Sequence, residues 1–208
     1  MAAWDAPSFC SGNWRHLCVD MQRMFAEDTP WHVPWMDKVK DRVVEVSVRH
    51  AGRTIFTRFM PPRTADEAAG AWRDYYEKWR MMTRERLPGE PLDILPDLRH
   101  LVPPAKVFDK PGYSPWLDGR LHAALRQEGV TALAISGGET DMCVLATVLG
   151  AIDLGYRIVL LEDAICGSAD ETHDASLTVL GERFSVQLDL VTAPTFLEAC
   201  ATFATAPR

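Results

Sequence analysis

The sequence lacks several features that would point to a large charged partner or to a membrane. It has no excess of basic residues, because 22 Lys and Arg stand against 29 Asp and Glu for a net charge of −7. This balance argues against nucleic acid or an anionic membrane surface as the main partner. The longest apolar stretch, residues 144–152, is too short to cross a bilayer. Residues 1–13 show no basic region followed by an apolar one, so no secretory signal is expected.

Cysteine is scarce, and no Cys-x-x-Cys pair occurs, which removes the usual signature of a structural zinc cluster. Because the number of cysteines is odd and their spacing is wide, we expect no disulfide framework and predict a reducing, cytoplasmic location. The five residues are Cys10, Cys18, Cys143, Cys166 and Cys200.

The glycine-rich phosphate loops, the His-Glu-x-x-His zinc motif and the Gly-x-Ser-x-Gly nucleophile motif are also absent. The sequence therefore gives little support for binding of a dinucleotide or a nucleoside triphosphate. It gives equally little support for a zincin or a serine hydrolase, and no cofactor is expected. The 208 residues are 47% hydrophobic and 25% charged, which is typical of a soluble globular protein. The length predicts one domain over residues 1–208.

What the chain does contain is an alternation of short apolar runs with amphipathic helical patterns. Strands are predicted over residues 16–20, 53–58, 106–109, 131–136, 157–163 and 187–191. Helices are predicted over residues 38–48, 66–84, 117–128, 141–154, 169–183 and 195–202. This alternation predicts an α/β protein, a three-layer α/β/α sandwich around a six-stranded parallel sheet. We expect a Rossmann-like strand order, 3-2-1-4-5-6.

Ligands of such folds bind at the carboxyl ends of the strands, so residues that follow strands are candidates for function. Cys143 follows the fourth strand and falls in the first turn of a helix, after Gly137 and Gly138. Free N–H groups and the helix dipole at that place favour a thiolate and can hold an oxyanion. A small core residue is the alternative explanation of Cys143.

A cysteine nucleophile needs a base, and no histidine follows a predicted strand. Asp20 follows the first strand, where partial burial would raise its pKa toward that of a working base. Lys110 follows the third strand and can stabilise a thiolate and orient the Asp20 carboxylate. Taken singly, a loop aspartate and a surface lysine are the simpler explanations. The six histidines, each expected to be structural or solvated, are His16, His32, His50, His100, His122 and His173.

Four segments, residues 19–25, 110–114, 137–144 and 155–159, together resemble the isochorismatase-like cysteine hydrolases, an amidohydrolase family. The resemblance covers residues 15–197. It implies an Asp20, Lys110 and Cys143 catalytic triad and a non-proline cis peptide between Gly138 and Glu139. It also implies an oxyanion hole formed by the N–H groups of Glu139 and Cys143.

Departures from the family pattern bear on the substrate. Residues 58–62 lack the Asp-x-His pair of metal-dependent nicotinamidases, so no metal is expected and nicotinamide becomes a poorer candidate. Glu139 stands where many relatives have a small residue, which affects pocket size or charge. Members that hydrolyse the isochorismate vinyl ether lack the cysteine, so Cys143 favours amide chemistry.

Substrate contacts and subunit contacts are harder to separate. Arg58 can pair with a substrate carboxylate or form a salt bridge. The loop over residues 31–35 can close over a ligand or pack on another subunit. An aromatic stripe at residues 72, 75, 76 and 79 favours core or subunit packing over a pocket wall, so a homo-oligomer is expected. The predicted substrate-binding residues are Gln22, Phe25, Trp31, Arg58, Tyr113 and Trp116.

The predicted function is hydrolysis of a small-molecule carboxamide, ureide or carbamoyl compound through a thioester, with release of ammonia or an amine. A vinyl-ether hydrolase is one alternative, and it would stay active without Cys143. A silent oligomeric scaffold is another, and its cysteine would react with iodoacetamide no faster than free cysteine, whereas a triad thiolate would react much faster. A flavin- or nucleotide-binding module would need a phosphate loop that the sequence lacks.

Overall fold

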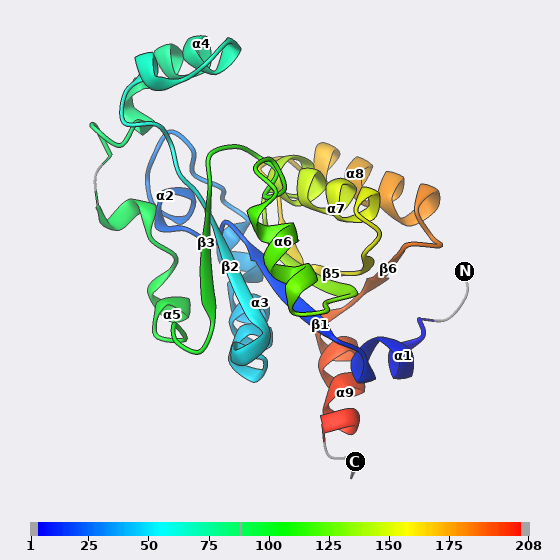
Figure 1. Ribbon diagram of the computed structural model, residues 1–208. Helices are drawn as coiled ribbons and strands as arrows, with labels where there is room; N and C mark the ends of the chain where they lie inside the picture. The colour runs from blue at the N-terminus through cyan, green and yellow to red at the C-terminus, as the bar shows by residue number, and fades with distance from the viewer. Residues whose placement is uncertain (1–3, 88, 205–208) are drawn as a thin grey trace.

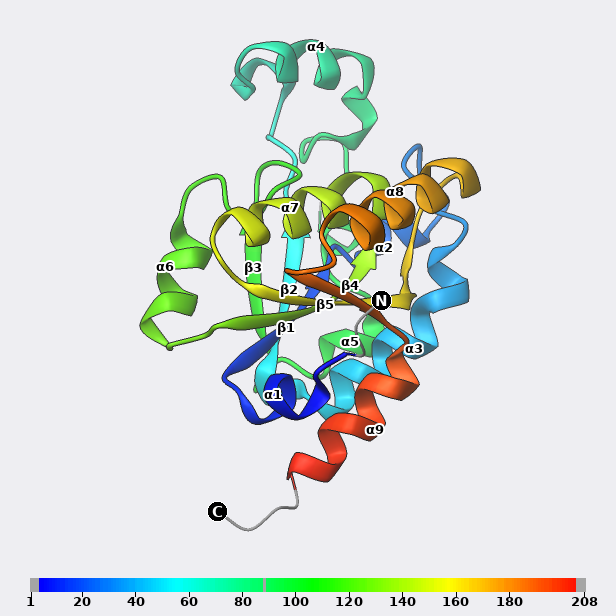
Figure 2. The ribbon, with the colours of Figure 1, turned by 90° about the vertical axis from the view of Figure 1, so that its right-hand side faces the viewer.

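The computed structural model describes residues 4–87 and 89–204, which fold around one parallel sheet of six strands in the order β3-β2-β1-β4-β5-β6 (Figure 1). The strands are β1 Trp14–Val19, β2 Thr54–Phe59, β3 Lys106–Lys110, β4 Ala132–Gly138, β5 Arg157–Cys166 and β6 Leu188–Val191. Helices cover both faces, so the predicted fold class and strand order are confirmed (Figure 2). The domain prediction over residues 1–208 stays a prediction, and residues 1–3, 88 and 205–208 lie outside the described part.

One face of the sheet is covered by four helices, whose apolar side chains share one core with the strands. In α3, Val39, Val43 and Val46 are spaced to form one stripe, and all three are buried in this core. The helices are α1 Ala6–Ser11, α3 Met36–Arg49, α5 Pro96–Arg99 and α9 Ala193–Ala204.

The opposite face is covered by three helices, α6 Arg120–Gln127, α7 Leu145–Asp153 and α8 Asp170–Arg183 (Figure 2). Leu133, Ile135 and Leu160 of the central strands are fully buried beneath them. Burial on both faces explains why these strands read as continuous apolar runs in the sequence.

A third, smaller core lies outside the sandwich and joins α2 (Arg23–Ala26) to α4 (Ala71–Lys78), which projects beyond the sheet (Figure 1). The single helix predicted over residues 66–84 was wrong. Gly70 adopts a left-handed φ of 57°, which separates the 3-10 turn η2 (Ala65–Glu67) from α4. The other 3-10 turns are η1 Ala51–Arg53, η3 Arg80–Met82 and η4 Glu90–Leu92.

Cys10 of α1 and Cys200 of α9 form a disulfide, a pairing that the sequence analysis, which expected no disulfide framework, did not predict. The two residues are 190 positions apart in sequence and meet because α1 packs on α9. The remaining cysteines, at positions 18, 143 and 166, are free and buried. The disulfide removes the ground on which a cytoplasmic location was predicted. In the described part of the chain, no helix is both long and apolar enough to cross a membrane.

Candidate active site

The carboxyl ends of three strands bring a carboxylate, an ammonium and a thiol into contact. Asp20 follows β1, Lys110 ends β3, and Cys143 lies in the π-helical turn η5 (Thr140–Val144) after β4. Lys110 Nζ lies 2.7 Å from Asp20 Oδ2 and 3.5 Å from Cys143 Sγ. The side chains of Asp20 and Lys110 are each 1% exposed, and Cys143 is 7% exposed. These three residues therefore form one charged cluster that is almost dry.

Local backbone geometry fixes the Asp20 carboxylate. Asp20 is the one non-glycine residue of the described chain with a positive φ, 49°, a conformation that costs about 1–3 kcal/mol and needs support from its surroundings. Thr57 of β2 supplies that support, because its hydroxyl donates to Asp20 Oδ1 at 2.6 Å and accepts from the Asp20 amide at 3.2 Å. A Cβ at Gly137 would meet the Val19 carbonyl oxygen at 2.1 Å, so only glycine lets β4 pass this close to the β1 backbone directly before Asp20.

Lys110 is held by three acceptors. Besides Asp20 and Cys143, its Nζ donates to the carbonyl oxygen of Gly112 at 2.9 Å, and it lies 5.3 Å from the ring centroid of Phe59. Burial lowers the pKa of Lys110, but the Asp20 carboxylate and Cys143 raise it more, so the net pKa is raised. Lys110 therefore keeps its positive charge inside the protein.

The Cys143 thiol is held in its protonated form. Burial raises the pKa of Cys143 well above its ordinary value, and the Asp20 carboxylate raises it further. Lys110 lowers the pKa of the thiol, but not enough to offset those two effects. This direction is opposite to the thiolate expected from the start of a helix, because burial and the Asp20 carboxylate raise the pKa of Cys143 more than Lys110 lowers it. The resting cluster thus consists of a carboxylate, an ammonium and a thiol.

The chain turns sharply between β4 and Cys143. The Gly138–Glu139 peptide bond is cis. The Glu139 carbonyl accepts from the Met142 amide at 3.2 Å and from the Val144 amide at 2.9 Å, which closes the turn that carries Cys143. The assignment of the Glu139 and Cys143 amides to an oxyanion hole stays a prediction.

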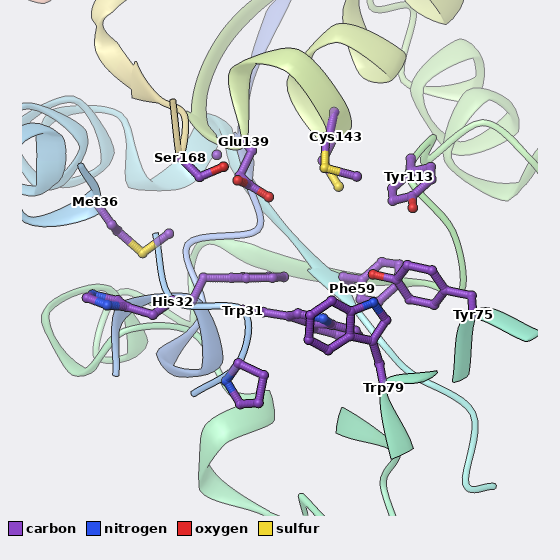
Figure 3. Close-up of a pocket in the computed structure, with 14 residues that line it drawn as sticks. Trp31, His32, Met36, Phe59, Tyr75, Trp79, Tyr113, Glu139, Cys143 and Ser168 are labelled. Atoms are coloured by element: carbon purple, nitrogen blue, oxygen red, sulfur yellow. The ribbon is translucent and has the colours of Figure 1, made fainter. Parts of the chain in front are cut away.

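A cavity of about 340 Å³ opens beside Cys143 (Figure 3). Of the six residues predicted to contact substrate, Phe25, Trp31 and Tyr113 line this cavity. The Glu139 side chain lines it as well, on the same side as Ser168 and Cys143 in Figure 3. Burial raises the pKa of Glu139, as does nearby Asp141, while a hydrogen bond with Ser168 opposes the shift.

The structure does not place Gln22, Arg58 or Trp116 at this cavity, which corrects their predicted role. The Gln22 amide is buried, donating to the Phe59 and Leu92 carbonyls and accepting from the Phe59 amide. Arg58 lies inside β2 and pairs with Asp109 and Asp93, as its alternative explanation proposed. Trp116 Nε1 donates to the carbonyl of residue 147 at 2.9 Å.

Several lining residues were missed from the sequence. Tyr75 and Trp79, two members of the aromatic stripe, line the cavity, whereas Tyr76 is buried in the small core beside it. Ser168 lies two residues after the end of β5, but the predicted strand stopped at residue 163, inside β5. A longer predicted strand would have identified Ser168 as a strand-end residue. Other lining residues that the sequence analysis did not assign are Met36, Phe59 and Met142.

The histidines do not supply a base to Cys143. His16 lies inside β1, fully buried between Thr54 and Ser136, and burial lowers its pKa to about 3. His173 of α8 is buried, with Nδ1 2.8 Å from the Thr140 hydroxyl, so of the two expected roles it has the structural one. His32 lines the cavity at its exposed side. In the described chain, no histidine hydrogen-bonds Asp20 or Cys143, and no group of three or more His, Cys, Asp or Glu is placed to hold a metal ion.

The isochorismatase domain family matches residues 16–190 of this chain. The protein belongs to the isochorismatase family. It is 31% identical over 137 residues to ureidoacrylate amidohydrolase RutB of Stutzerimonas stutzeri, covering 62% of this chain and 46% of that protein. It is 33% identical over 69 residues to a probable inactive nicotinamidase of Arabidopsis thaliana, covering 33% and 35% of the two chains. The chain therefore spans less than half the length of these curated relatives.

A solved structure shares the fold of this chain. A cysteine hydrolase from Pseudomonas syringae pv. phaseolicola 1448A superposes with a TM-score of 0.77 at 20% identity, covering 91% of this chain and 93% of that one. At 20% identity the similarity shows a shared fold alone, and the chemistry of this protein depends on its own residues.

Proposed function

We propose that this isochorismatase-family protein is a cysteine-dependent amidohydrolase that acts on a small carboxamide, ureide or carbamoyl compound. The observation that carries the proposal is the contact of Lys110 Nζ with both Asp20 and Cys143, at 2.7 and 3.5 Å, beside a cavity of small-molecule size. A nucleophile, a base that can take its proton, and a cation beside both that stabilises the negative charge wherever it resides are what acyl transfer to a thiol requires.

The first half of the reaction forms a thioester. Because the Cys143 thiol is protonated at rest, it needs a base, and Asp20 takes its proton as Sγ attacks the substrate carbonyl carbon. Lys110 lowers the free energy of the thiolate as it forms. The amides of Glu139 and Cys143 hold the oxyanion of the tetrahedral intermediate. When the C–N bond breaks, Asp20 gives its proton to the departing nitrogen, which leaves as ammonia or an amine.

The second half releases the acid. Asp20, again a carboxylate, takes a proton from a water molecule that attacks the thioester carbon. The tetrahedral intermediate collapses with cleavage of the C–S bond, and the thiolate recovers the proton from Asp20. The acid product leaves, and the resting carboxylate, ammonium and thiol are restored. Asp20 thus serves as base, acid, base and acid in turn, because Lys110 keeps its carboxylate in place throughout.

The alternative functions account for less of this site. Vinyl-ether hydrolysis needs an acid but no thiol, so it leaves the Lys110–Cys143 contact unexplained. A silent scaffold has no need of a buried ion pair, which generally adds little to stability compared with apolar packing. A homo-oligomer remains our prediction for either function.

An ammonia-release screen over amides, ureides and carbamoyl amino acids tests the proposal. We expect the wild-type protein to release ammonia from at least one of these classes, and Cys143→Ala to lose at least about 10³-fold of that activity. Cys18→Ala is the matched control, since Cys18 is a buried thiol of β1 outside the cluster. Residual activity of Cys143→Ala within about tenfold of wild type would refute the nucleophile.

A further inference from the structure

The cavity beside Cys143 carries a carboxylate but no cationic Lys or Arg side chain. Glu139 is the one acidic residue that lines it among the described residues, and its neighbours are the Ser168 hydroxyl and a second acid, Asp141. Lys110 lies nearby, but its Nζ is already engaged with Asp20, Cys143 and Gly112. A half-buried carboxylate without a cationic partner is costly, so the cavity as built favours a ligand that brings positive charge.

A large part of the remaining wall is aromatic and is centred on Trp31. Its ring centroid lies 5.8 Å from that of Phe59, 5.9 Å from Tyr75 and 6.4 Å from Trp79. The faces of aromatic rings attract cations through the ring quadrupole, and they do not attract anions. His32 lies at the other end of the cavity from Tyr75, on the exposed side (Figure 3). The aromatic wall and Glu139 therefore favour the same ligand charge.

We infer that Glu139 and the aromatic wall around Trp31 select an amide substrate that carries a cationic nitrogen group, and that they reject substrates carrying a carboxylate. This inference rests on the proposed amidohydrolase function, whose substrate class it narrows. Glu139 directly precedes the turn η5 that holds Cys143, so the cationic group lies close to the scissile carbonyl. The cavity volume of about 340 Å³ is at the low end for ligand pockets, so the substrate is small.

Three ligands of nearly the same shape and different charge test the selection: benzamidine, which is cationic, benzamide, which is neutral, and benzoate, which is anionic. Binding is measured by isothermal titration calorimetry on the Cys143→Ala protein, so that no ligand is turned over. We expect benzamidine to bind at least about tenfold more tightly than benzamide, and benzoate to bind more weakly than both.

Adding Glu139→Gln to Cys143→Ala tests whether this carboxylate is responsible. We expect the affinities for benzamidine and benzamide to converge to within about threefold. The added control is Glu182→Gln, which removes an exposed carboxylate of α8 and should leave the order unchanged. Thermal melting checks that each variant is folded. Benzoate binding as tightly as benzamidine, or an unchanged benzamidine preference in Glu139→Gln, would overturn the inference.

The proposed amidohydrolase function and the inferred preference for a cationic substrate can be contradicted independently of each other. Ligand selection is an equilibrium property of the cavity and needs no turnover, so it can hold even where Cys143→Ala retains amidase activity. Conversely, loss of turnover in Cys143→Ala together with preferred binding of benzoate would support the nucleophile and overturn the cationic substrate.

Discussion

Two ion pairs on β3 lie one residue apart and differ in their physical surroundings. Lys110 pairs with Asp20, and both side chains are 1% exposed. Asp109 pairs with Arg58, and these side chains are 46% and 24% exposed. Successive residues of a strand point to opposite faces, so one strand places one pair in a dry site and the other in contact with water.

The difference shows what burial adds to a charge pair. Water screens the Arg58–Asp109 pair and can replace either partner, so its loss changes little. The Lys110–Asp20 pair has no such replacement, and each ion depends on the other and on its hydrogen bonds. Only the buried pair also touches a thiol, through the 3.5 Å contact of Lys110 with Cys143. The chemistry proposed for this protein belongs to the buried pair alone.

The largest effect is expected from Lys110→Met, which breaks the buried pair. It leaves the Asp20 carboxylate buried without its cation, at a cost of about 3–5 kcal/mol in the free energy of unfolding. It also removes the charge that stabilises the thiolate, so kcat/KM should fall by about 10²–10³-fold. Urea unfolding and ammonia release measure the two effects. Wild-type kcat/KM in a folded Lys110→Met protein would remove Lys110 from the mechanism.

A smaller effect is expected from Thr57→Val, which keeps both ions and removes the hydroxyl that orients Asp20. Loss of a hydrogen bond to a charged group costs about 1.5–3 kcal/mol in stability. Because Thr57 acts through Asp20, kcat should fall while KM stays near its wild-type value. Thr172→Val, at an exposed hydroxyl of α8, is the control. A change in KM alone would contradict the positioning role.

Alkylation with iodoacetamide tests the protonation of the buried thiol. The pKa of Cys143 is raised, so less thiolate is present at neutral pH than in free cysteine, and the reaction should be at least about tenfold slower. Its rate should keep rising with pH beyond the point where free cysteine levels off. Cys143→Ala gives the background from Cys18 and Cys166, whose pKa values burial raises to about 12. Alkylation faster than free cysteine at neutral pH would contradict the raised pKa.

The smallest effect is expected from Arg58→Met, which breaks the exposed pair with Asp109 and also removes the contact of Arg58 with Asp93. Stability should change by about 1 kcal/mol or less, and kcat/KM should stay within about twofold of wild type. Measured beside Lys110→Met, this variant shows whether burial separates the two pairs. A loss of activity as large as that of Lys110→Met would mean that the surface pair also serves the reaction.

Much of the buried cluster was predictable from the sequence. Asp20, Lys110 and the glycines before Cys143 each stand at the end of a predicted strand, and parallel strands gather such residues at one edge of the sheet. The family resemblance then implied that they act together. The protonation of Cys143 was not predictable, because it depends on burial and on the distance to Asp20. The position of Cys143 at the start of a helix predicted a lowered pKa, whereas burial and the Asp20 carboxylate raise it.

The residues of the cavity wall were harder to predict because many of them lie in segments outside the sheet. Trp31, Tyr75 and Trp79 lie on the loop after α2 and on the projecting α4 segment, whose placement follows from tertiary packing around a small separate core. The disulfide was missed for a similar reason, since Cys10 and Cys200 meet only once two distant helices have packed.

Mass spectrometry of acid-quenched single turnovers tests the central claim most directly. With an amide substrate found in the screen, the wild-type protein should carry the acyl group on the peptide that contains Cys143, and Cys143→Ala should carry none and form no product. Product formed by Cys143→Ala at a rate within about tenfold of wild type, with no acyl group on the wild-type cysteine, would contradict the account.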